Sequence, residues 1–335
     1  MDVLRKLLFP ISLVYAFIVF LRNRLYDAGV FTSTSFRTKT ICVGNLSVGG
    51  TGKTPMIELL VRTLSPKYTV AVLSRGYKRK STGFVLATPK TSVETLGDEP
   101  FQLAAKFPEI VVAVDADRRN GISRIQETLA PNVILLDDAF QHRKVKPGFN
   151  ILLTAYNHLY IDDWALPTGN LRDLKGEADR ANIIVVTKCP EVLSVTEQHN
   201  LIKRLKPKVH QKVLFSQISY DRMLKGENTD RLLHELKNEE LTLVTGIANP
   251  ALLIAFLKDE GITFDHLQFN DHHFFTYKEI DNLKQKRCIL TTEKDYVRLK
   301  DDLSNLYYIE IKHQFMDDGQ SILDIELQNF MTTDY

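Results

Sequence analysis

Short apolar runs alternate with amphipathic segments along most of the chain. Apolar runs bounded by polar turns predict buried strands, and segments with apolar residues three and four positions apart predict helices. Strands that alternate with helices in this way favour a parallel sheet covered by helices on both faces. The expected strands are 41–43, 70–73, 110–114, 133–136, 151–154, 183–186 and 213–218, and the expected helices are 55–64, 100–106, 119–128 and 196–205.

The pattern changes after residue 218, which predicts a second and smaller unit. Residues 225–240 are rich in Lys, Glu and Asn and are typical of a connection or insertion. A further alternation then gives expected strands at 241–245, 264–269, 288–291 and 306–311 and expected helices at 250–258 and 278–284. A length of 335 residues also exceeds what one hydrophobic core usually serves. The expected parts are an apolar N-terminal helix over 1–28, a core domain over 29–218 and a smaller α/β domain over 219–335.

The first apolar segment is distinguished by the basic residues that bracket it. Residues 7–21 are almost wholly apolar, with Arg5 and Lys6 before them and Arg22 and Arg24 after them. A helix needs about 20 apolar residues to cross a bilayer, and this segment is shorter. Basic flanks favour a helix that lies in or dips into an anionic membrane surface. A buried core helix of the first domain is the alternative that the length allows.

Composition and charge exclude several classes of partner. The formal net charge is +2, and no segment concentrates Lys and Arg with interleaved aromatic residues, so we expect no nucleic acid partner. The three cysteines, Cys42, Cys189 and Cys288, lie far apart without metal-ligand spacing. This usage indicates a reducing compartment without a disulfide framework. We expect the protein to be a monomer.

A Gly-rich segment lies between the first expected strand and the first expected helix. It consists of Ser47, Val48, Gly49, Gly50, Thr51, Gly52, Lys53 and Thr54. In a phosphate-binding loop of this kind, backbone N–H groups turn toward the β-phosphate, Lys53 reaches the β- and γ-phosphate oxygens, and the Thr54 hydroxyl binds Mg²⁺. The strict pattern has Gly where Ser47 stands. The segment predicts binding of a nucleoside triphosphate, against the alternative of a turn that binds nothing.

Two carboxylates, Asp137 and Asp138, follow the apolar strand at 133–136. An acid in this place, downstream of a phosphate loop, is typical of the residue that holds the metal's water shell, although an ordinary strand-end turn has the same local pattern. Gln141 and His142 come just beyond the carboxyl end of the strand, where open α/β sheets bind their ligands. We therefore expect these side chains to lie near the phosphate loop.

Two further groups of polar residues have more than one interpretation. Asp98 and Glu99 precede a helix, where they could act only as an N-terminal cap. Asp271, His272 and His273 contain possible metal ligands, but adjacent side chains of an extended segment point to opposite faces, and no third ligand is suitably spaced. We favour a histidine polarised by an aspartate over a zinc site.

Taken in order, these motifs resemble those of the tetraacyldisaccharide 4′-kinase family. The matching segments are GNLSVGGTGKTP at 44–55, SRGY at 74–77, GDEP at 97–100, DR at 117–118, DDAFQH at 137–142, LPTGNLR at 166–172 and DHH at 271–273. The resemblance covers essentially the whole chain, including the basic and apolar N-terminus. Two residues depart from the family pattern: Ala139 stands where Gly is usual, and Asp173 stands where Glu commonly follows the Arg.

The resemblance implies a P-loop NTPase-like α/β/α sandwich with a smaller C-terminal α/β domain and an N-terminal membrane-associated helix. It implies ATP-dependent phosphorylation of the 4′-hydroxyl of a tetraacyldisaccharide 1-phosphate, which forms lipid IV-A in lipid A biosynthesis. The implied cofactors are ATP and Mg²⁺. The implied partners are the acylated disaccharide lipid and an anionic membrane surface, at the cytoplasmic face of the inner membrane.

The family's site residues carry over onto matching positions of this chain. By similarity, Asp98 is the catalytic base, His272 orients or tunes it, and Lys53 acts on the transferred phosphoryl group. The implied metal ligands are Thr54, Asp138 and Gln141. The implied substrate-binding residues are Tyr77, Arg118, His142 and Arg172. Closure of the second domain would complete the site.

Two other classes of protein fit parts of the sequence. A membrane-associated GTPase or ATPase switch would use a base-reading Asn-Lys-x-Asp motif, but Thr187 and Pro190 replace its Asn and Asp. A soluble small-metabolite kinase would leave the N-terminal apolar segment unexplained. Dependence of ATP consumption on an acylated disaccharide distinguishes all three.

Overall fold

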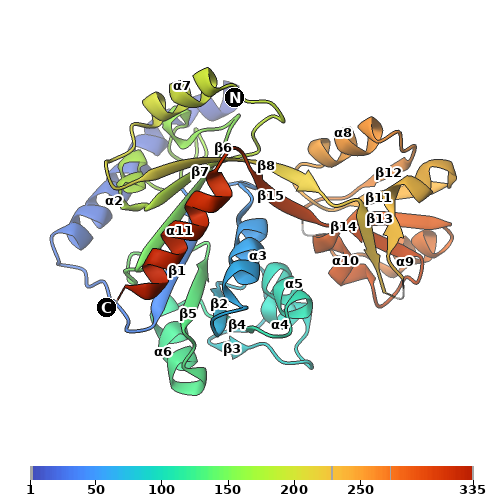
Figure 1. Cartoon of the computed structure of the whole chain (residues 1–335), viewed down its shortest axis with the longest axis horizontal. Helices are drawn as coiled ribbons and strands as arrows, with labels where there is room; N and C mark the ends of the chain where they lie inside the picture. The colour runs from blue at the N-terminus through green and yellow to red at the C-terminus, as the bar shows by residue number, and fades with distance from the viewer. Residues whose placement is uncertain (1–2, 228, 272, 334–335) are drawn as a thin grey trace.

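The computed structural model describes residues 3–227, 229–271 and 273–333, which form two α/β units joined by a pair of strands (Figure 1). The larger unit is built on a nine-stranded sheet of order β15-β8-β7-β6-β1-β5-β2-β4-β3. The strands from β8 to β4 in this order are parallel, and the edge strands β15 and β3 are antiparallel to their neighbours. The strands are β1 Lys39–Asn45, β2 Val70–Ser74, β3 Val85–Leu86, β4 Val111–Val114, β5 Val133–Asp137, β6 Phe149–Ala155, β7 Ile183–Thr187, β8 Lys212–Tyr220 and β15 Ile311–Phe315.

Helices cover both faces of this sheet, and each face has its own apolar core. One core takes residues from α3, α5 and α11, and the other takes residues from α6 and α7. The helices of the larger unit are α1 Val3–Leu7, α2 Phe9–Asp27, α3 Lys53–Leu64, α4 Val93–Leu96, α5 Asp98–Lys106, α6 Arg118–Leu129, α7 Val195–Leu205 and α11 Gly319–Thr332, with 3₁₀ turns η1 Tyr160–Asp162 and η2 Lys175–Arg180. The expected α/β/α architecture is confirmed.

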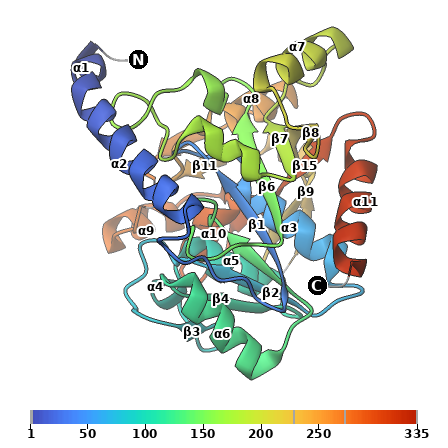
Figure 2. The same ribbon diagram turned by 90° about the vertical axis from the view of Figure 1, so that its left-hand side faces the viewer.

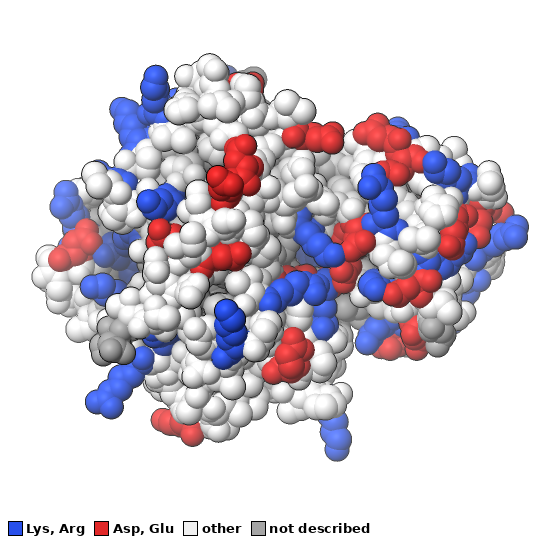
Figure 3. Space-filling view, viewed as in Figure 1, with Lys and Arg blue, Asp and Glu red and all other residues white. Residues whose placement is uncertain are grey.

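The smaller unit contains a six-stranded sheet of order β10-β9-β14-β13-β11-β12. Its strands are β9 Met223–Gly226, β10 Arg231–Leu232, β11 Leu241–Thr245, β12 Asp265–Gln268, β13 Cys288–Thr292 and β14 Leu306–Ile309, and its helices are α8 Ala251–Asp259, α9 Tyr277–Lys284 and α10 Glu293–Leu299, with a 3₁₀ turn η3 Leu233–Asn238. On the face shown in Figure 3, acidic and basic side chains are interspersed over this unit. Neither sign of charge dominates that face.

The end of the chain returns to the larger unit, which differs from the boundary expected at 219–335. Strand β15 pairs with β8 along Ile311–Phe315. Helix α11 then buries Leu323, Leu327 and Met331 in the core beneath the larger sheet. The sequence pattern indicates an apolar side on such a helix but does not say which sheet covers it. The smaller sheet therefore spans 223–309.

Helix α2 lies along the outside of the larger unit and exposes most of its apolar side chains (Figure 2). Its buried residues are Ser12, Val19 and Asn23. Because apolar contacts hold so little of it, α2 is not the buried core helix that its length allowed. Among the residues that the structure describes, no helix is long and apolar enough to span a bilayer.

Polar contacts attach α2 to the loop at 163–174. The Ser12 hydroxyl donates to the Thr168 hydroxyl over 2.7 Å, and the Asn23 amide donates to Asp173 over 2.8 Å. Arg22 forms an ion pair of 3.2 Å with the same carboxylate. Asp173, the residue that departs from the family pattern, therefore fastens the end of α2 to this loop.

Candidate active site

The Gly-rich segment forms a loop between β1 and α3. Gly49 and Gly52 have φ angles of 116° and 87°, a region that favours glycine. A Cβ atom on Gly52 would lie 2.9 Å from the ring of His313, so a side chain does not fit there. Helix α3 begins at Lys53, directly after the left-handed Gly52. Its first N–H groups and the positive end of its dipole make this loop suited to an anion such as a phosphate.

Side chains from three other places hold the loop by its carbonyl groups and hydroxyls. The Asn45 amide donates to the Thr51 hydroxyl over 2.9 Å, and the Thr187 hydroxyl donates to the Thr51 carbonyl over 2.9 Å. His313 of β15 lies 2.8 Å from the Gly52 carbonyl through Nε2. These contacts tie the loop to β1, β7 and β15. The roles of Thr187 and His313 were not predicted, because neither residue belongs to the phosphate-loop motif and both are distant from it in the sequence.

His313 is a neutral donor in this arrangement. Burial lowers the pKa of His313 to about 4. Because the Gly52 carbonyl can only accept, Nε2 carries the proton, and Nδ1 then accepts from the Ser216 hydroxyl at 3.0 Å. The strand that returns from the smaller unit thus supports the phosphate loop directly.

The two carboxylates at the end of β5 have different environments. Asp137 is buried and accepts a hydrogen bond of 2.9 Å from the Ser74 hydroxyl. Burial, followed by the negative charges of Glu99 and Asp138, raises the pKa of Asp137 to about 7. Asp138 has a left-handed φ of 47° and lies 3.8 Å from the Lys53 ammonium. Burial raises the pKa of Asp138, but Lys53 and Arg172 outweigh it and lower the pKa overall, so this carboxylate is ionised.

Arg172 and Gln141 complete this group of polar side chains. The Arg172 guanidinium donates to both carboxylate oxygens of Asp138, over 2.9 Å for Nη1–Oδ2, and also to the Asn45 side chain. Gln141 donates to the Asn45 carbonyl over 2.6 Å. The structure therefore brings four of the expected residues together at the carboxyl ends of β1 and β5, beside the phosphate loop. They are Lys53, Asp138, Gln141 and Arg172.

The other expected substrate-binding residues have varied surroundings. Arg118 is 2% exposed and donates to the carbonyls of Asp115 and Asp137 over 2.6 and 3.0 Å. It therefore fastens the ends of β4 and β5.

His142 is another of the expected substrate-binding residues. Burial, followed by the nearby charge of Arg118, lowers the pKa of His142 to about 4, and its buried Nε2 has no hydrogen-bond partner within the described part of the chain. Tyr77 is 62% exposed. Their roles toward a substrate stay predictions.

Asp98, the expected base, is the first residue of α5 and is 5% exposed. Both of its oxygens accept from Arg298 of α10, over 2.9 Å for Nε–Oδ1. Arg298 also donates to the His273 carbonyl over 2.6 Å. His272, expected to act with Asp98, lies outside the described residues. Arg298 was missed because it is 200 positions from Asp98 in the sequence and belongs to the other unit.

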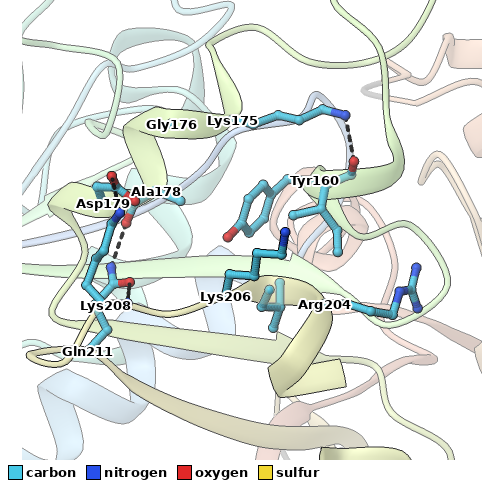
Figure 4. A pocket seen from close by; sticks show the side chains of 11 residues that line it. Tyr160, Lys175, Gly176, Ala178, Asp179, Arg204, Lys206, Lys208 and Gln211 are labelled. Atoms are coloured by element: carbon cyan, nitrogen blue, oxygen red, sulfur yellow. Dashed lines mark hydrogen bonds and ion pairs between the residues drawn. The ribbon is translucent and has the colours of Figure 1, made fainter. Parts of the chain in front are cut away.

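Two other features bear on where the active site lies: clustered metal ligands and surface cavities. In the ranges that the structure describes, no three His, Cys, Asp or Glu residues lie close enough together to hold a metal ion. A cavity of about 300 Å³ lies elsewhere, between η2 and the end of α7 (Figure 4). Lys175 at this cavity donates to the Ile161 carbonyl over 2.6 Å, and Lys208 pairs with Asp179 over 3.2 Å. The phosphate loop, where Lys53, Asp138 and Arg172 meet, is the candidate active site.

The chain is similar to known proteins along nearly its whole length. A family model described as tetraacyldisaccharide-1-P 4′-kinase matches residues 4–328. The chain is 50% identical over 337 residues to the tetraacyldisaccharide 4′-kinase of Flavobacterium johnsoniae, with 99% of this chain and 98% of the relative covered. It is 43% identical over 353 residues to the corresponding enzyme of Phocaeicola vulgatus, with 99% and 95% covered.

A solved structure agrees with these relatives. It is the crystal structure of LpxK from Aquifex aeolicus, described as an apo form in complex with ATP. It matches with a TM-score of 0.81 at 30% identity and covers 98% of this chain and 99% of that one. The resemblance inferred from the sequence motifs is confirmed. The chain belongs to the tetraacyldisaccharide 4′-kinase family.

Proposed function

We propose that this chain transfers the γ-phosphoryl group of ATP to the 4′-hydroxyl of a tetraacyldisaccharide 1-phosphate. The product would be lipid IV-A, and the reaction would take place on the cytoplasmic face of the inner membrane. The observation that carries the proposal is the meeting of Lys53 and Asp138 at 3.8 Å, where the phosphate loop faces the end of β5. In phosphoryl transfer by a phosphate-loop enzyme, a lysine of the loop binds the β- and γ-phosphates, and an aspartate after a strand helps to hold Mg²⁺.

The residues present fit the Mg²⁺ that such a reaction uses. Mg²⁺ is usually held by one or two protein oxygens together with phosphate oxygens and water, so a cluster of three acidic side chains is not required. The hydroxyl of Thr54, the ionised carboxylate of Asp138 and the amide oxygen of Gln141 are the candidate ligands. When bound, the ion would neutralise charge on the β- and γ-phosphate oxygens.

The remaining chemistry belongs to side chains of this chain. Lys53 stabilises the charge that develops on the transferred phosphoryl group. Asp98 orients the acceptor hydroxyl and receives its proton as the new O–P bond forms. The Arg172 guanidinium donates to the Asp138 carboxylate, and the Arg172 carbonyl accepts from the Tyr15 hydroxyl of α2 over 3.0 Å. Arg172 therefore connects the nucleotide side of the site to α2, the helix proposed to face the lipid.

Helix α2 supports the proposal that the acceptor is reached at a membrane surface. Its exposed face carries large apolar side chains, such as Phe17 at 63% and Ile18 at 60% exposure. Taking an acyl chain out of a bilayer costs about 0.8 kcal/mol per methylene, so the enzyme must approach the lipid instead of drawing it into water. An exposed apolar patch of this kind is typical of a surface that meets a membrane or a partner.

The test of this proposal is acceptor-dependent transfer of labelled phosphate. The protein is incubated with γ-labelled ATP, Mg²⁺ and the detergent-solubilised tetraacyldisaccharide 1-phosphate, and the labelled lipid is analysed for the position of the new phosphate. The matched control is the same lipid with its 4′-hydroxyl blocked. We expect label in the lipid only when the 4′-hydroxyl is free. Hydrolysis of ATP or GTP that is indifferent to the lipid would instead support a nucleotide-dependent switch.

A further inference from the structure

We propose that Arg298 is a positioning residue for Asp98, supplied by the smaller unit to the active site of the larger one. The inference rests on the proposed function, because it assigns Asp98 the task of receiving the proton of the acceptor hydroxyl. It adds a residue that no sequence motif identified. In the proposed reaction the acceptor hydroxyl contacts Asp98, whereas Arg298 acts through Asp98.

The contact between Arg298 and Asp98 is bidentate. Arg298 donates through Nε to Oδ1 of Asp98 over 2.9 Å and through Nη2 to Oδ2, while Nη1 donates to the His273 carbonyl over 2.6 Å. The side chains of Arg298 and Asp98 are 4% and 5% exposed. Paired N–H donors fix both the place and the plane of a carboxylate, which a single point charge does not do. One guanidinium thus sets the position of Asp98 relative to the backbone of His273.

Helix α10, which carries Arg298, is itself held firmly in the smaller unit. The Asp295 carboxylate accepts from the Gly246 N–H over 2.8 Å and from the Thr292 hydroxyl over 2.7 Å. The Thr292 hydroxyl in turn caps the helix by accepting from the Asp295 N–H over 3.2 Å. Because α10 is tied to the ends of β11 and β13, the position of Arg298 follows that of the smaller sheet.

A second ion pair joins the same two helices at their other ends. Lys106, the last residue of α5, pairs with Glu293, the first residue of α10, over 2.8 Å. Its ammonium also pairs with Glu58 of α3 over 2.7 Å and with Glu310 over 2.9 Å. Ion pairs at both ends of α5 therefore fix α10 against it. Since α3 begins with Lys53 of the phosphate loop, the contacts connect the base to the nucleotide side of the site.

The chemical role of Arg298 follows from how protons move in the proposed reaction. The acceptor O–H bond breaks and its oxygen forms a bond to the γ-phosphorus, while the bond from that phosphorus to the β,γ-bridging oxygen breaks and ADP leaves. The proton passes to Asp98. A carboxylate has about four lone-pair sites, so an oxygen engaged by the guanidinium can still accept from a hydroxyl. Arginine stays protonated throughout, so Arg298 orients the acceptor of the proton and does not exchange one itself.

The test compares Arg298→Lys, which keeps the charge and loses the fork, with Arg298→Gln, which loses both. We expect kcat for labelled phosphate transfer to fall about 10-fold in the first and about 10²-fold in the second, with KM for ATP unchanged. In an Asp98→Asn background, Arg298→Gln should cause no further loss, because both changes disable one unit. The matched control is Arg231→Gln, which breaks a similar fork to Glu239 within the smaller unit and should leave kcat unchanged.

The expected results distinguish failure of the positioning role of Arg298 from failure of the proposed kinase function. Parental kcat in both Arg298 variants overturns the inference, and so does a full additional loss in the Asp98→Asn background or a loss confined to KM for ATP. If Arg298→Gln does not fold, the Arg298→Lys variant decides, and parental kcat there overturns the role of the fork. A parent protein that labels no acceptor contradicts the proposed function itself. A parent that labels the acceptor while Arg298→Gln does so equally contradicts only the role of Arg298.

Discussion

The two long helices at the ends of the chain attach to the same unit in opposite ways. Helix α11 is held by buried apolar side chains, among them Leu323 and Leu327. The Lys39 ammonium caps its end by donating to the carbonyls of Phe330 and Met331 over 2.8 and 2.6 Å. Helix α2 is instead held mainly by hydrogen bonds and an ion pair, and most of its apolar side chains are exposed. The two helices thus have different surroundings: α11 packs on the sheet, whereas most apolar side chains of α2 are exposed.

The difference shows what an apolar segment does and does not predict. The hydrophobic effect drives apolar surface out of water, but it does not select the partner that covers that surface. For α11 the partner is the sheet of the same chain. For α2 the polar side chains contact the loop at 163–174, and most of the apolar side chains are exposed. We propose that a membrane covers this apolar face. The predictions below test this contrast.

The largest expected effect is a loss of stability in α11. Leu327→Ala should lower the free energy of unfolding by about 2–5 kcal/mol, because it leaves a cavity in a core where Leu327 is 1% exposed. Ile325→Ala in the same helix is the matched control, since Ile325 is 57% exposed, and should change stability by less than about 0.5 kcal/mol. Denaturant titration measures both. Equal effects would mean that α11 does not pack as described.

A slightly smaller effect is expected for membrane binding by α2. Replacing Phe17 and Ile18 by Ser should weaken binding to anionic vesicles by about 10²-fold, because each side chain contributes about 1.5–3 kcal/mol when fully buried. Val19 is 6% exposed on the docked side, so it is not a suitable position for this test. Co-sedimentation gives the affinity, with Ile325→Ser as the exposed control on α11. Undiminished sedimentation of the α2 variant would contradict the role of its apolar face.

The polar attachment of α2 should contribute less than the core of α11. Asp173→Ala removes the acceptor for Asn23 and for the Arg22 ion pair, which should weaken the attachment of α2 by about 1–3 kcal/mol. Hydrogen exchange should then become faster across Phe9–Asp27 and stay unchanged across Gly319–Thr332. Faster exchange in both helices would show that Asp173 supports the whole unit.

The smallest expected effect separates the basic residues that flank α2. Arg5 donates to the Gly169 carbonyl over 2.6 Å and Arg22 pairs with Asp173, whereas Lys6 and Arg24 are exposed. Lys6→Gln and Arg24→Gln should each weaken binding to anionic vesicles by about 1 kcal/mol at low salt and by less at high salt. Neutral vesicles serve as the control. An equal loss on neutral vesicles would exclude an electrostatic contribution.

Sequence patterns predicted the elements whose apolar residues are regular, and missed those whose roles depend on distant partners. The strands and helices expected for the larger sheet are present within a few residues of their predicted bounds, because buried strands are continuous apolar runs. Helices α10 and α11 were not predicted, and α11 determines the boundary between the units. Local patterns do not encode which sheet a helix covers.

The residues of the candidate site also fall into those that belong to local motifs and those that act through distant partners. Lys53, Asp138 and Gln141 were identifiable because the phosphate loop and the acid at a strand end are local motifs. His313 and Arg298 were not, since each acts through a partner that only the fold brings near. The structure shows Arg118 buried against the carbonyls of Asp115 and Asp137, a contact that the motif did not predict, and its expected role toward a substrate stays a prediction.

The most direct test of the account is phosphate transfer by Lys53→Ala. Lys53 begins α3 beside Asp138, and its side chain, although only 16% exposed, belongs to neither apolar core. We therefore expect a folded variant, by denaturant titration, whose transfer of labelled phosphate from ATP to the 4′-hydroxyl of the acceptor falls by at least about 10³-fold. A folded Lys53→Ala protein that phosphorylates the acceptor at a near-parental rate would contradict the assignment of the phosphate loop as the site of the reaction.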